Sequence, residues 1–408
     1  MAIDNKDKKV LKSSIEREQN EVACSAECEK IKGSKNLNVP HLRFPEFSGE
    51  WEMVSLQDIA TINPKSDPLQ NTFIYIDLEA VEKGELRKIQ EIMREEAPSR
   101  AQRVIDNNDI LFQCVRPYQK NNYIHRILNT SNQQWVASTG YAQIRTTELP
   151  NYIYHLLNTD EFNRKVMVRC TGSSYPAINS EDLATIHLYY TPDKKEQLKI
   201  SRLLDLLDKR IATQNKIIED LKKLKSAIRK KMFSLLKDEY TESFEINQLL
   251  DYEQPTAYIV ANDEYSTDTS LTPVLTANKG FILGYTDEKF GIYQKGECII
   301  FDDFTMDAKY VSFPFKVKSS AIKILTAKPN VNLRFMFEYL SYWELKSEGH
   351  KRHYISEIAS LVIELPSKER QSIIASLMTS LNSKLDIEAK TKIRYEEQKR
   401  YLLSQMFI

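Results

Sequence analysis

Two long stretches of the chain carry apolar residues alternately three and four positions apart, and neither contains proline or glycine after its first residue. One begins at Pro192 and closes with Met232-Phe233. The other begins at Pro366 and closes with Met406-Phe407. Such spacing, sustained over about five heptads, is typical of a coiled-coil seam. At about 1.5 Å per residue, forty residues form a rod of about 60 Å. The pattern predicts long helices at 192–236 and 366–408.

These two stretches are copies of each other. With Pro192 placed on Pro366, some forty residues align without a gap. The polar positions within the copies also coincide: Gln197 with Gln371, Gln214 with Glu388, and Lys225 with Lys399. Polar residues in a seam cost stability but fix register and partner choice. We therefore expect the two helices to pair with each other within one chain, and not to be unrelated surface helices.

A globular segment precedes each helix, from about Trp51 to Tyr190 and from about Phe244 to Leu365. Their starts echo each other weakly: Trp51, Leu56 and Asp58 against Phe244, Leu249 and Asp251. Their ends, after Gly172 and after Gly349, share a similar order of residues. Between these ends almost nothing aligns. A repeated frame with different contents is expected of two different binding domains held at a fixed separation.

Short strands and helices are mixed within the globular segments. Strands are predicted at 73–76, 109–112 and 298–301, next to turn-forming residues. Residues 150–167 and 333–348 have helical spacing, and we interpret them as core helices, not as aromatic binding stripes. The fold class is therefore mixed α/β (α+β). Residues 1–36 are rich in Lys and Glu without a sustained apolar face, which predicts a charged, flexible tail.

The composition narrows the class of protein. A chain of 408 residues suggests two or three domains, and 41% hydrophobic residues are too many for a disordered protein. Lys plus Arg and Asp plus Glu both number 57, so the net charge is zero. No apolar run approaches the ~18 residues of a membrane span. The five cysteines form no disulfide framework, and Cys24 and Cys28 lack a second ligand pair for zinc. We expect a cytoplasmic protein without a metal site.

Charge is distributed unevenly along this neutral chain. Residues 194–231 hold 13 Lys and Arg against 5 Asp and Glu, residues 368–400 hold 8 against 5, and residues 237–270 hold 1 against 9. A basic helix is often only a solvated face, and it can also contact DNA phosphates. We favour a third interpretation, a docking surface for partner subunits, for most of these charges.

No enzyme motif stands out. The chain lacks the glycine-rich cofactor loop and N-P-P-F/Y motif of a methyltransferase, and it has no phosphate-binding loop or G-x-S-x-G motif. Asp287-Glu288-Lys289 and Asp193-Lys194-Lys195 match the D-x-K of some nucleases, but such tripeptides arise by chance in a Lys-rich chain. The sequence predicts no catalytic residues.

Several of these features together resemble the specificity (S) subunit of type I restriction-modification enzymes, over residues 37–408. The carrying residues are Leu42-Arg43-Phe44-Pro45-Glu46-Phe47 with Trp51, Asp109 to Phe112 with Arg116-Pro117, Pro192 with Glu196 and Gln197, the glycine-to-proline endings and the Met-Phe ends. Two features depart from the family's pattern. The second copy has Arg370 where the first has Glu196, and the tail has no family role to transfer.

The resemblance implies a bacterial, cytoplasmic, non-catalytic subunit. Its domains would be target-recognition domain 1 at 37–191, a central helix at 192–236, target-recognition domain 2 at 237–365 and a C-terminal helix at 366–408. The helices would pair antiparallel and act as a ruler between two half-sites of an asymmetric DNA sequence. Expected partners are double-stranded DNA, two modification subunits, and restriction subunits. S-adenosylmethionine, ATP and Mg are expected on those partners, and no cofactor is expected on this chain.

Base-reading residues vary within such a family, so our candidates rest on residue chemistry alone. Arg pairs bidentately with guanine, and Asn or Gln with adenine. In the first domain the candidates are Arg100, Arg103, Arg116, Tyr118, Gln119, Lys120, Asn121 and Asn122, followed by Arg169, Ser173, Ser174 and Tyr175 around Gly172.

In the second domain the loop at the matching frame position supplies His350, Lys351, Arg352, His353 and Tyr354, to which we add Lys309. Asp302, Asp303 and Thr305 could accept from cytosine or simply cap a turn.

Two other classes of protein fit parts of the pattern. A structural or adhesion protein would use the helices for self-association and would not bind DNA. A standalone regulatory or anti-restriction protein would bind DNA tightly without any partner.

Overall fold

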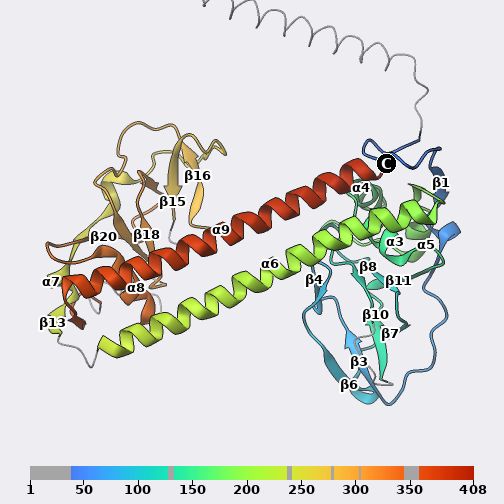
Figure 1. Ribbon diagram of the computed structural model, residues 1–408, viewed down its shortest axis with the longest axis horizontal. Helices are drawn as coiled ribbons and strands as arrows, with labels where there is room; N and C mark the ends of the chain where they lie inside the picture. Colours follow the sequence, from blue (N-terminus) through green and yellow to red (C-terminus); the bar gives the residue numbers. More distant parts are fainter. Residues whose placement is uncertain (1–37, 127–132, 237–240, 277–279, 303–304, 344–357) are drawn as a thin grey trace, which may run out of the picture. The chain divides into compact units, whose positions relative to one another are not determined.

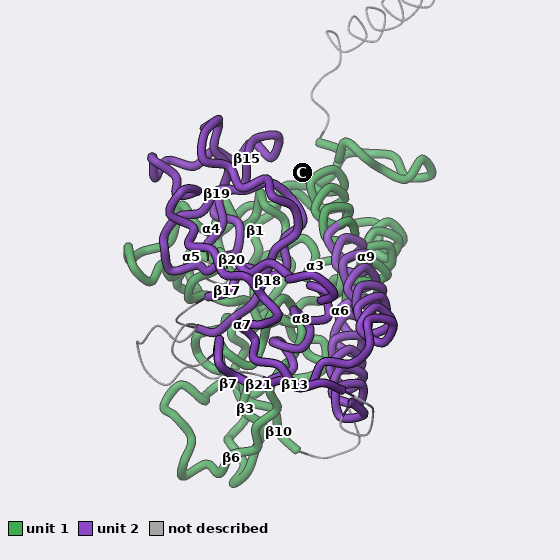
Figure 2. Tube along the Cα trace, turned by 90° about the vertical axis from the view of Figure 1, so that its left-hand side faces the viewer, with its two compact units in different colours: residues 1–211, 394–408 green, residues 212–393 purple. Residues whose placement is uncertain are grey.

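The computed structural model describes residues 38–126, 133–236, 241–276, 280–302, 305–343 and 358–408. The chain divides into two compact units, which Figure 2 distinguishes by colour. Unit 1 comprises residues 1–211 and 394–408, and unit 2 comprises residues 212–393. Each long helix therefore contributes one part to each unit. The tail expected at 1–36 lies outside the described residues.

Unit 1 combines short strands with short helices (Figure 1). They are β1 (Glu52–Ser55), α2 (Leu56–Ile59), β2 (Ala60–Ile62), β3 (Thr72–Ile76), β4 (Val81–Glu82), β5 (Glu85–Leu86), β6 (Gln90–Met93), β7 (Ala101–Ile105), β8 (Ile110–Gln113), β9 (Tyr123–Ile124), β10 (Gln134–Ser138), β11 (Tyr141–Thr146), α3 (Pro150–Leu157), α4 (Asp160–Arg169), α5 (Ser180–Ala184) and β12 (His187–Tyr190). One sheet has the order β6-β3-β10-β7 and another β2-β11-β8-β9. The predicted strands at 73–76 and 109–112 correspond to β3 and β8.

Unit 2 repeats the order of framing strands, sheets and core helix of unit 1, with different residues. Its elements are β13 (Glu242–Glu245), α7 (Ile246–Leu249), β14 (Leu250–Glu253), β15 (Thr272–Leu275), β16 (Ile282–Thr286), β17 (Cys298–Asp302), β18 (Ala308–Val311), β19 (Lys316–Val317), β20 (Ile322–Ala327), α8 (Leu333–Tyr342) and β21 (Val362–Leu365). The sheets have the orders β14-β20-β17-β18 and β16-β15-β19. The predicted strand at 298–301 is β17, which is buried along its whole length.

The helical segment expected at 150–167 is two helices, not one. α3 ends at Leu157, and Thr159 caps a new helix by accepting a hydrogen bond from the Phe162 amide. A threonine in an extended conformation at this position satisfies an amide that the first turn of a helix leaves unpaired. The apolar spacing continues across the break because α3 and α4 bury residues in the same core.

A small antiparallel pair of strands frames each unit. β1 pairs with β12 in unit 1, and β13 pairs with β21 in unit 2. In both units a one-turn helix with a capping box follows the first strand, formed by Ser55 and Asp58 in α2 and by Glu245 and Gln248 in α7. These boxes match at an offset of 190 residues (245 − 55), whereas the sequence echo placed Trp51 on Phe244. The frame is repeated, but the predicted echo was three residues out of register.

The long helices are α6 (Lys194–Leu235) and α9 (Lys368–Met406). They run antiparallel, because residues later in α6 contact residues earlier in α9. In unit 1 the Lys399 side chain donates to Asp208. In unit 2 the Gln214 side chain donates to the backbone oxygen and to a side-chain oxygen of Glu388. The predicted pairing within one chain is therefore confirmed.

The polar seam positions play different roles. Gln214 and Glu388, which coincide in the sequence repeat, contact each other directly. Lys399 pairs with Asp208 on the opposite helix. Lys225 instead has its ammonium nitrogen 3.8 Å from a carboxylate oxygen of Glu338 on α8. It therefore helps to join α6 to the core helix of the second domain.

A buried glutamine joins each long helix to the core helix of its domain. The Gln197 side chain accepts from the Leu149 amide (3.2 Å) and donates to the Thr191 carbonyl. Gln371 accepts from the Asn332 amide (2.9 Å) and donates to the Pro366 carbonyl. Leu149 and Asn332 are the N-caps of α3 and α8. The repeated glutamine therefore fixes the start of one helix against the start of another in both units.

Further along α3 and α8, a buried polar side chain faces the long helices. In unit 1 His155 Nε2 lies 2.8 Å from Asp205 of α6, with the ring fully buried. In unit 2 Glu338 accepts two hydrogen bonds from Arg229 of α6 at 2.6 and 2.9 Å. The two positions lie equally far from the glutamine-bound N-caps, since 155 − 149 and 338 − 332 are both six. The units therefore use the same position with different polar side chains, an imidazole that contacts a carboxylate and a carboxylate that accepts from a guanidinium.

Candidate nucleic-acid interface

Two loops of unit 1 meet beside the C-terminal end of β8. The first spans residues 114–120, and the second spans residues 170–178. Val115 forms a β-bridge with Ala177, and the Arg116 amide donates to the Pro176 carbonyl at 2.7 Å. Backbone contacts thus lock the two loops together, although they lie far apart in the sequence.

The first loop holds two bulky residues in the left-handed backbone region. Arg116 has φ 55° and Lys120 has φ 52°, on either side of the 3₁₀ turn Pro117–Gln119. This conformation costs a residue with a side chain on the order of 1–3 kcal/mol, so surrounding structure must impose it. Residues of this kind cluster at binding and active sites, which makes the loop a candidate site.

Side-chain amides supply that surrounding structure. Gln113 at the end of β8 donates to Gln119 Oε1 (2.9 Å) and accepts from the Asn121 amide (3.1 Å). Asn122, almost fully buried, accepts from the Gln113 amide and donates to Asn158. Gln113 was missed by sequence reasoning. The only signal was a glutamine closing an otherwise apolar strand.

Arg116 stacks on an exposed ring from the second loop. Its guanidinium carbon lies 4.3 Å from the centre of the Tyr175 ring, and 63% of Tyr175 is exposed. Gly172 makes the tight turn possible with φ 88°, because a Cβ atom there would lie 3.0 Å from the Tyr175 carbonyl oxygen. Within the described residues, no acceptor bonds the guanidinium of Arg116. Its donors remain available to a ligand.

Other candidates of the first domain are engaged internally. Lys120 donates to Asp160 (2.6 Å) and to the Asn158 carbonyl, and Arg169 donates to the Asp182 carbonyl and to Thr185. Asn121 accepts from the Lys83 amide. These side chains tie the loops to α4, α5 and the β4–β5 hairpin.

The remaining first-domain candidates differ in exposure. Arg100, Tyr118, Ser173 and Ser174 are exposed. Arg103 of β7 is half-buried, and its Nε has no hydrogen-bond partner among the described residues. Burial lowers the pKa of Arg103 below its usual value. The structure therefore brings Arg116, Tyr118 and Tyr175 to two joined loops, and leaves Arg103 on a strand of the other sheet.

Candidates in the second domain are only partly described. His350, Lys351, Arg352, His353 and Tyr354 lie outside the described residues, as does Asp303. Asp302 accepts from the Thr305 hydroxyl at 2.7 Å, and the Met306 amide bonds the Asp302 carbonyl, so this segment forms a capped turn. Lys309 lies half-buried in β18, paired with Ile300 of β17.

Comparison with known proteins identifies the family to which the chain belongs. The family described as the type I restriction modification DNA specificity domain matches residues 48–223 and 239–397, which is more than half of the chain. The chain belongs to the type I restriction-modification specificity family. The resemblance carried by the sequence motifs is thereby confirmed.

Two relatives and two solved structures illustrate the likeness. The EcoR124I/EcoR124II specificity subunit of Escherichia coli is 39% identical, over 39% of this chain and 43% of that protein. The putative MjaX specificity subunit of Methanocaldococcus jannaschii is 23% identical, over 62% of this chain and 66% of that protein. The chain thus matches less than half the length of the first relative and about two thirds of the second.

The solved structures show the same fold over most of their length. The S subunit of a type I restriction-modification system from M. genitalium gives a TM-score of 0.61 at 15% identity, covering 91% of this chain and 99% of that one. A chain from a structure on complex assembly and conformational transition of a type I R-M system gives 0.55 at 18% identity, covering 90% and 99%. The mixed α/β fold with two domains and two long paired helices is therefore shared with both of these proteins.

One family motif has a direct structural role in this specificity subunit. Arg43, from the Leu42 to Phe47 segment, donates to both carboxylate oxygens of Glu196 at 2.6 and 2.9 Å. Glu196 is fully buried and also accepts from Thr191. The segment thus closes over the start of α6. Glu196 in the first copy thus pairs with a cation from the segment before β1, whereas the second copy has Arg370 at the matching position.

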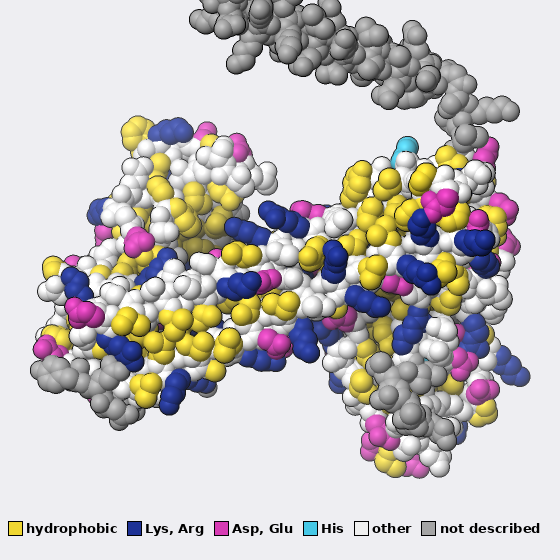
Figure 3. Space-filling model, viewed as in Figure 1, with side chains coloured by type: hydrophobic (Ala, Val, Ile, Leu, Met, Phe, Trp, Pro, Cys, Tyr) yellow, Lys and Arg dark blue, Asp and Glu magenta, His cyan; other side chains and the backbone are white. Residues whose placement is uncertain are grey.

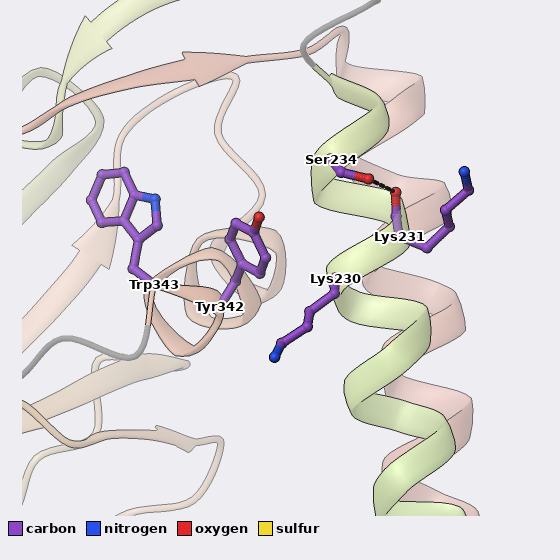
Figure 4. A pocket seen from close by; sticks show the side chains of 5 residues that line it. All are labelled: Lys230, Lys231, Ser234, Tyr342 and Trp343. Carbon is purple, nitrogen blue, oxygen red and sulfur yellow. Dashed lines mark hydrogen bonds between the residues drawn. The ribbon is translucent and has the colours of Figure 1, made fainter.

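An open hollow lies where α6 and α8 end in unit 2 (Figure 4). Lys230, Lys231, Ser234, Tyr342 and Trp343 line it. Lys230 extends toward the side of the rings, whereas Lys231 points away from them. Tyr342 stacks on the buried Phe233 at 5.1 Å and so belongs to the core. This composition is that of a solvated helix end and not of a closed binding site.

Within the described ranges, no group of three or more His, Cys, Asp or Glu side chains is placed to hold a metal ion. The Cys24 and Cys28 pair lies outside those ranges. Glu288 of the D-x-K tripeptide pairs with the buried Lys316 at 2.8 Å and accepts from the Ala261 amide, so its carboxylate serves to hold a loop. No helix among the described residues is long and apolar enough to cross a membrane.

Proposed function

We propose that this specificity subunit is the non-catalytic DNA-recognition component of a type I restriction-modification complex. In this proposal it binds a bipartite, asymmetric site through its two domains. The observation that carries the proposal is the repeated frame with different contents. β1, α2 and β12 recur as β13, α7 and β21, and the sheet order β2-β11-β8-β9 recurs as β14-β20-β17-β18. Between these elements the residues hardly align, and β7 and the β4–β5 hairpin have no counterpart among the described strands of unit 2. Two different domains on one frame suit two different half-sites.

The joined loops of unit 1 support DNA as the ligand. They present Arg116, Tyr118 and Tyr175 without internal partners for the Arg116 guanidinium, and Ser173 and Ser174 lie beside them. Arginine and small hydroxyl side chains contact base edges and phosphates. We propose that these loops contact one half-site, and that the second domain, including the 350–354 segment, contacts the other.

We further propose that α6 and α9 set the distance between the half-sites. The two helices are unbroken over 42 and 39 residues. Two contacts between them, Gln214 with Glu388 and Asp208 with Lys399, fix one register. A helix lengthens by about 1.5 Å per residue, so its length converts into a defined spacing.

Partner subunits are proposed to dock along the helices. Exposed faces there carry apolar side chains next to Lys and Arg, as Figure 3 shows for one face. The exposed apolar residues are Leu198, Leu206, Ile217, Leu224, Leu235, Ile373, Leu377, Ile387, Ile393 and Tyr401. Apolar residues surrounded by charged ones are typical of protein interfaces. We propose that two modification subunits dock there and that restriction subunits join them, with S-adenosylmethionine, ATP and Mg on the partners and no cofactor on this chain. The complex would act in the cytoplasm.

Mapping methylated adenines tests the proposal. The chain is co-expressed with its neighbouring modification subunit, and a plasmid library is read by single-molecule sequencing. The expected result is one asymmetric motif with two specific parts and a fixed gap. If no adenine is methylated and the purified chain binds neither DNA nor a stoichiometric partner, the proposal fails and a structural role replaces it.

A further inference from the structure

We infer that Arg116, oriented by the Tyr175 ring, reads a guanine in the half-site that unit 1 contacts. The inference rests on the proposed function and assigns a base and a residue to it. Arginine pairs bidentately with the O6 and N7 atoms of guanine, the commonest specific contact in the major groove.

Orientation is the first requirement for reading a base. A guanidinium is planar, and its donors form a rigid fork that must meet two acceptors at once. Tyr175 packs 4.3 Å from the Arg116 guanidinium carbon and so restricts the plane of that fork. No acceptor within the described residues bonds the fork, so the donors stay free for the base edge.

Rigidity of the supporting loop is the second requirement. Arg116 donates through its amide to the Pro176 carbonyl, and the Pro117–Gln119 turn follows immediately. Gln113 holds the far side of the loop through Gln119 and Asn121. A binding residue held by packing and hydrogen bonds loses less freedom when the ligand arrives. The left-handed backbone at Arg116 is the local cost of this placement.

The other cations of the first domain meet only some of these requirements. The Lys120 side chain donates to Asp160. The Arg169 guanidinium donates to the Asp182 carbonyl and to Thr185. Arg103 is half-buried on β7, and Arg100 is exposed without a ring beside it. Among the described candidates of this domain, Arg116 combines an oriented fork with unpaired donors.

A phosphate contact is the competing role for an exposed arginine, and it makes different predictions. Phosphate contacts carry no sequence information, so their loss weakens binding to all sequences and lowers the salt dependence. Loss of a base contact relaxes one position of the motif and leaves the others unchanged. The methylated motif itself therefore distinguishes the two roles.

The test uses the assembled complex of this chain with its modification subunit and compares Arg116→Gly, Tyr175→Ala and Tyr175→Phe. Glycine adopts φ 55° without strain, so Arg116→Gly removes the guanidinium while preserving the loop. The matched control is Arg164→Ala, an exposed arginine of α4 whose guanidinium pairs with Glu161. The readouts are the methylated motif and the salt dependence of binding to the wild-type site.

We expect Arg116→Gly to relax one guanine in one half-site, with discrimination at that position falling roughly 5- to 150-fold. Tyr175→Ala should relax the same position less, and Tyr175→Phe and Arg164→Ala should keep the wild-type motif. An unchanged motif with Arg116→Gly overturns the inference. So does uniform weakening with a salt slope reduced by about one. A wild-type complex without any bipartite motif overturns the proposed function itself, which distinguishes the two failures.

Discussion

At the scale of single residues, buried polar side chains decide how each domain joins the long helices. Glu338 is 1% exposed, yet it faces Arg229 and Lys225 of α6 and Asn382 of α9. At the corresponding place in unit 1, His155 faces Asp205. A buried charge is tolerated only when partners surround it, so each core helix suits the helices beside it and not those of the other unit.

Removing the buried carboxylate should destabilise unit 2. Glu338→Ala leaves the Arg229 guanidinium without its acceptor, and loss of one partner of a buried pair costs about 3 kcal/mol. Denaturant unfolding of the purified chain measures the change. The control is Glu219→Ala, which breaks an exposed pair with Lys223 and should change the free energy of unfolding by less than about 0.5 kcal/mol. Equal effects of both changes would contradict this account.

A second prediction concerns His125 and pH. The ring is fully buried beside Trp135, at 4.9 Å between centroids, and burial lowers the pKa of His125 to about 4. Asp109 partly opposes this effect and Arg126 adds to it. The unfolded chain, with an ordinary histidine pKa near 6.5, therefore binds more protons as the pH falls from about 6.5 to 4, and stability falls with it.

From pH 7 to pH 5 this histidine should cost unit 1 about 2 kcal/mol. The free energy of unfolding at the two pH values measures the loss. His125→Phe keeps the ring packing and removes the titration, so its loss over the same interval should be smaller by that amount. An identical pH dependence in both proteins would show that the pKa of His125 is the same in the folded and the unfolded chain.

At the scale of elements, the pairing of α6 with α9 depends on an apolar seam with a few polar positions. Gln214 is 6% exposed and donates to the Glu388 backbone and side chain. Glu388 also pairs with Lys384 on its own helix, which with the Gln214 contact lowers the pKa of that carboxyl. A seam polar pair of this kind selects one register at the expense of stability.

Replacing both residues with leucine should raise stability and weaken the register. We expect Gln214→Leu with Glu388→Leu to increase the free energy of unfolding by about 1–2 kcal/mol, because well-packed apolar residues replace a partly buried polar pair. Gln214→Leu alone should lower it, since Glu388 then loses a donor. Denaturant midpoints of the three proteins provide the measurement. A double variant less stable than the single one would refute a seam role for the pair.

At the scale of the whole molecule, one frame is used twice with different contents. The repeated glutamine contacts, from Gln197 to Leu149 and from Gln371 to Asn332, attach each domain to its long helix in the same way. The sheets that carry the candidate recognition loops share their strand order, apart from β7, which has no counterpart among the described strands of unit 2, but their residues hardly align. Attachment is thus constant while the residues of the two domains differ, as the proposed reading of two unlike half-sites requires.

The ruler proposal predicts the result of shortening both helices. Gln214 faces Glu388, so residues 212–218 of α6 lie opposite residues 384–390 of α9. Deleting both heptads preserves the seam spacing and removes about 10 Å, or roughly three base pairs of DNA. The methylated motif should keep both half-sites and lose about three base pairs from its gap. Altered half-site bases, or an unchanged gap, would refute the ruler.

Deletion of either heptad alone is the matched control. It leaves one heptad of one helix without its partner on the other, so the complex should lose stability without giving a new, shorter gap.

The sequence alone determined the helices, their pairing and the repeat. These features depend on local periodicity, and a spacing of three and four residues or a gap-free repeat is visible without coordinates. The same reasoning placed β3, β8 and β17, which are short and strongly apolar. It missed the break at Thr159 because a capping residue interrupts a helix without interrupting its apolar pattern.

Only the tertiary structure decided which polar residues form the candidate site. The sequence nominated Arg116, Lys120, Arg169 and Tyr175 on equal terms, since residue type reveals chemistry and not neighbours. In the folded chain a β-bridge between Val115 and Ala177 joins the loop of Arg116 to the loop of Tyr175. The side chains of Lys120 and Arg169 instead donate to acceptors within the protein. Contacts between segments far apart in the chain have no local period, so the availability of a side chain for DNA is a property of the fold.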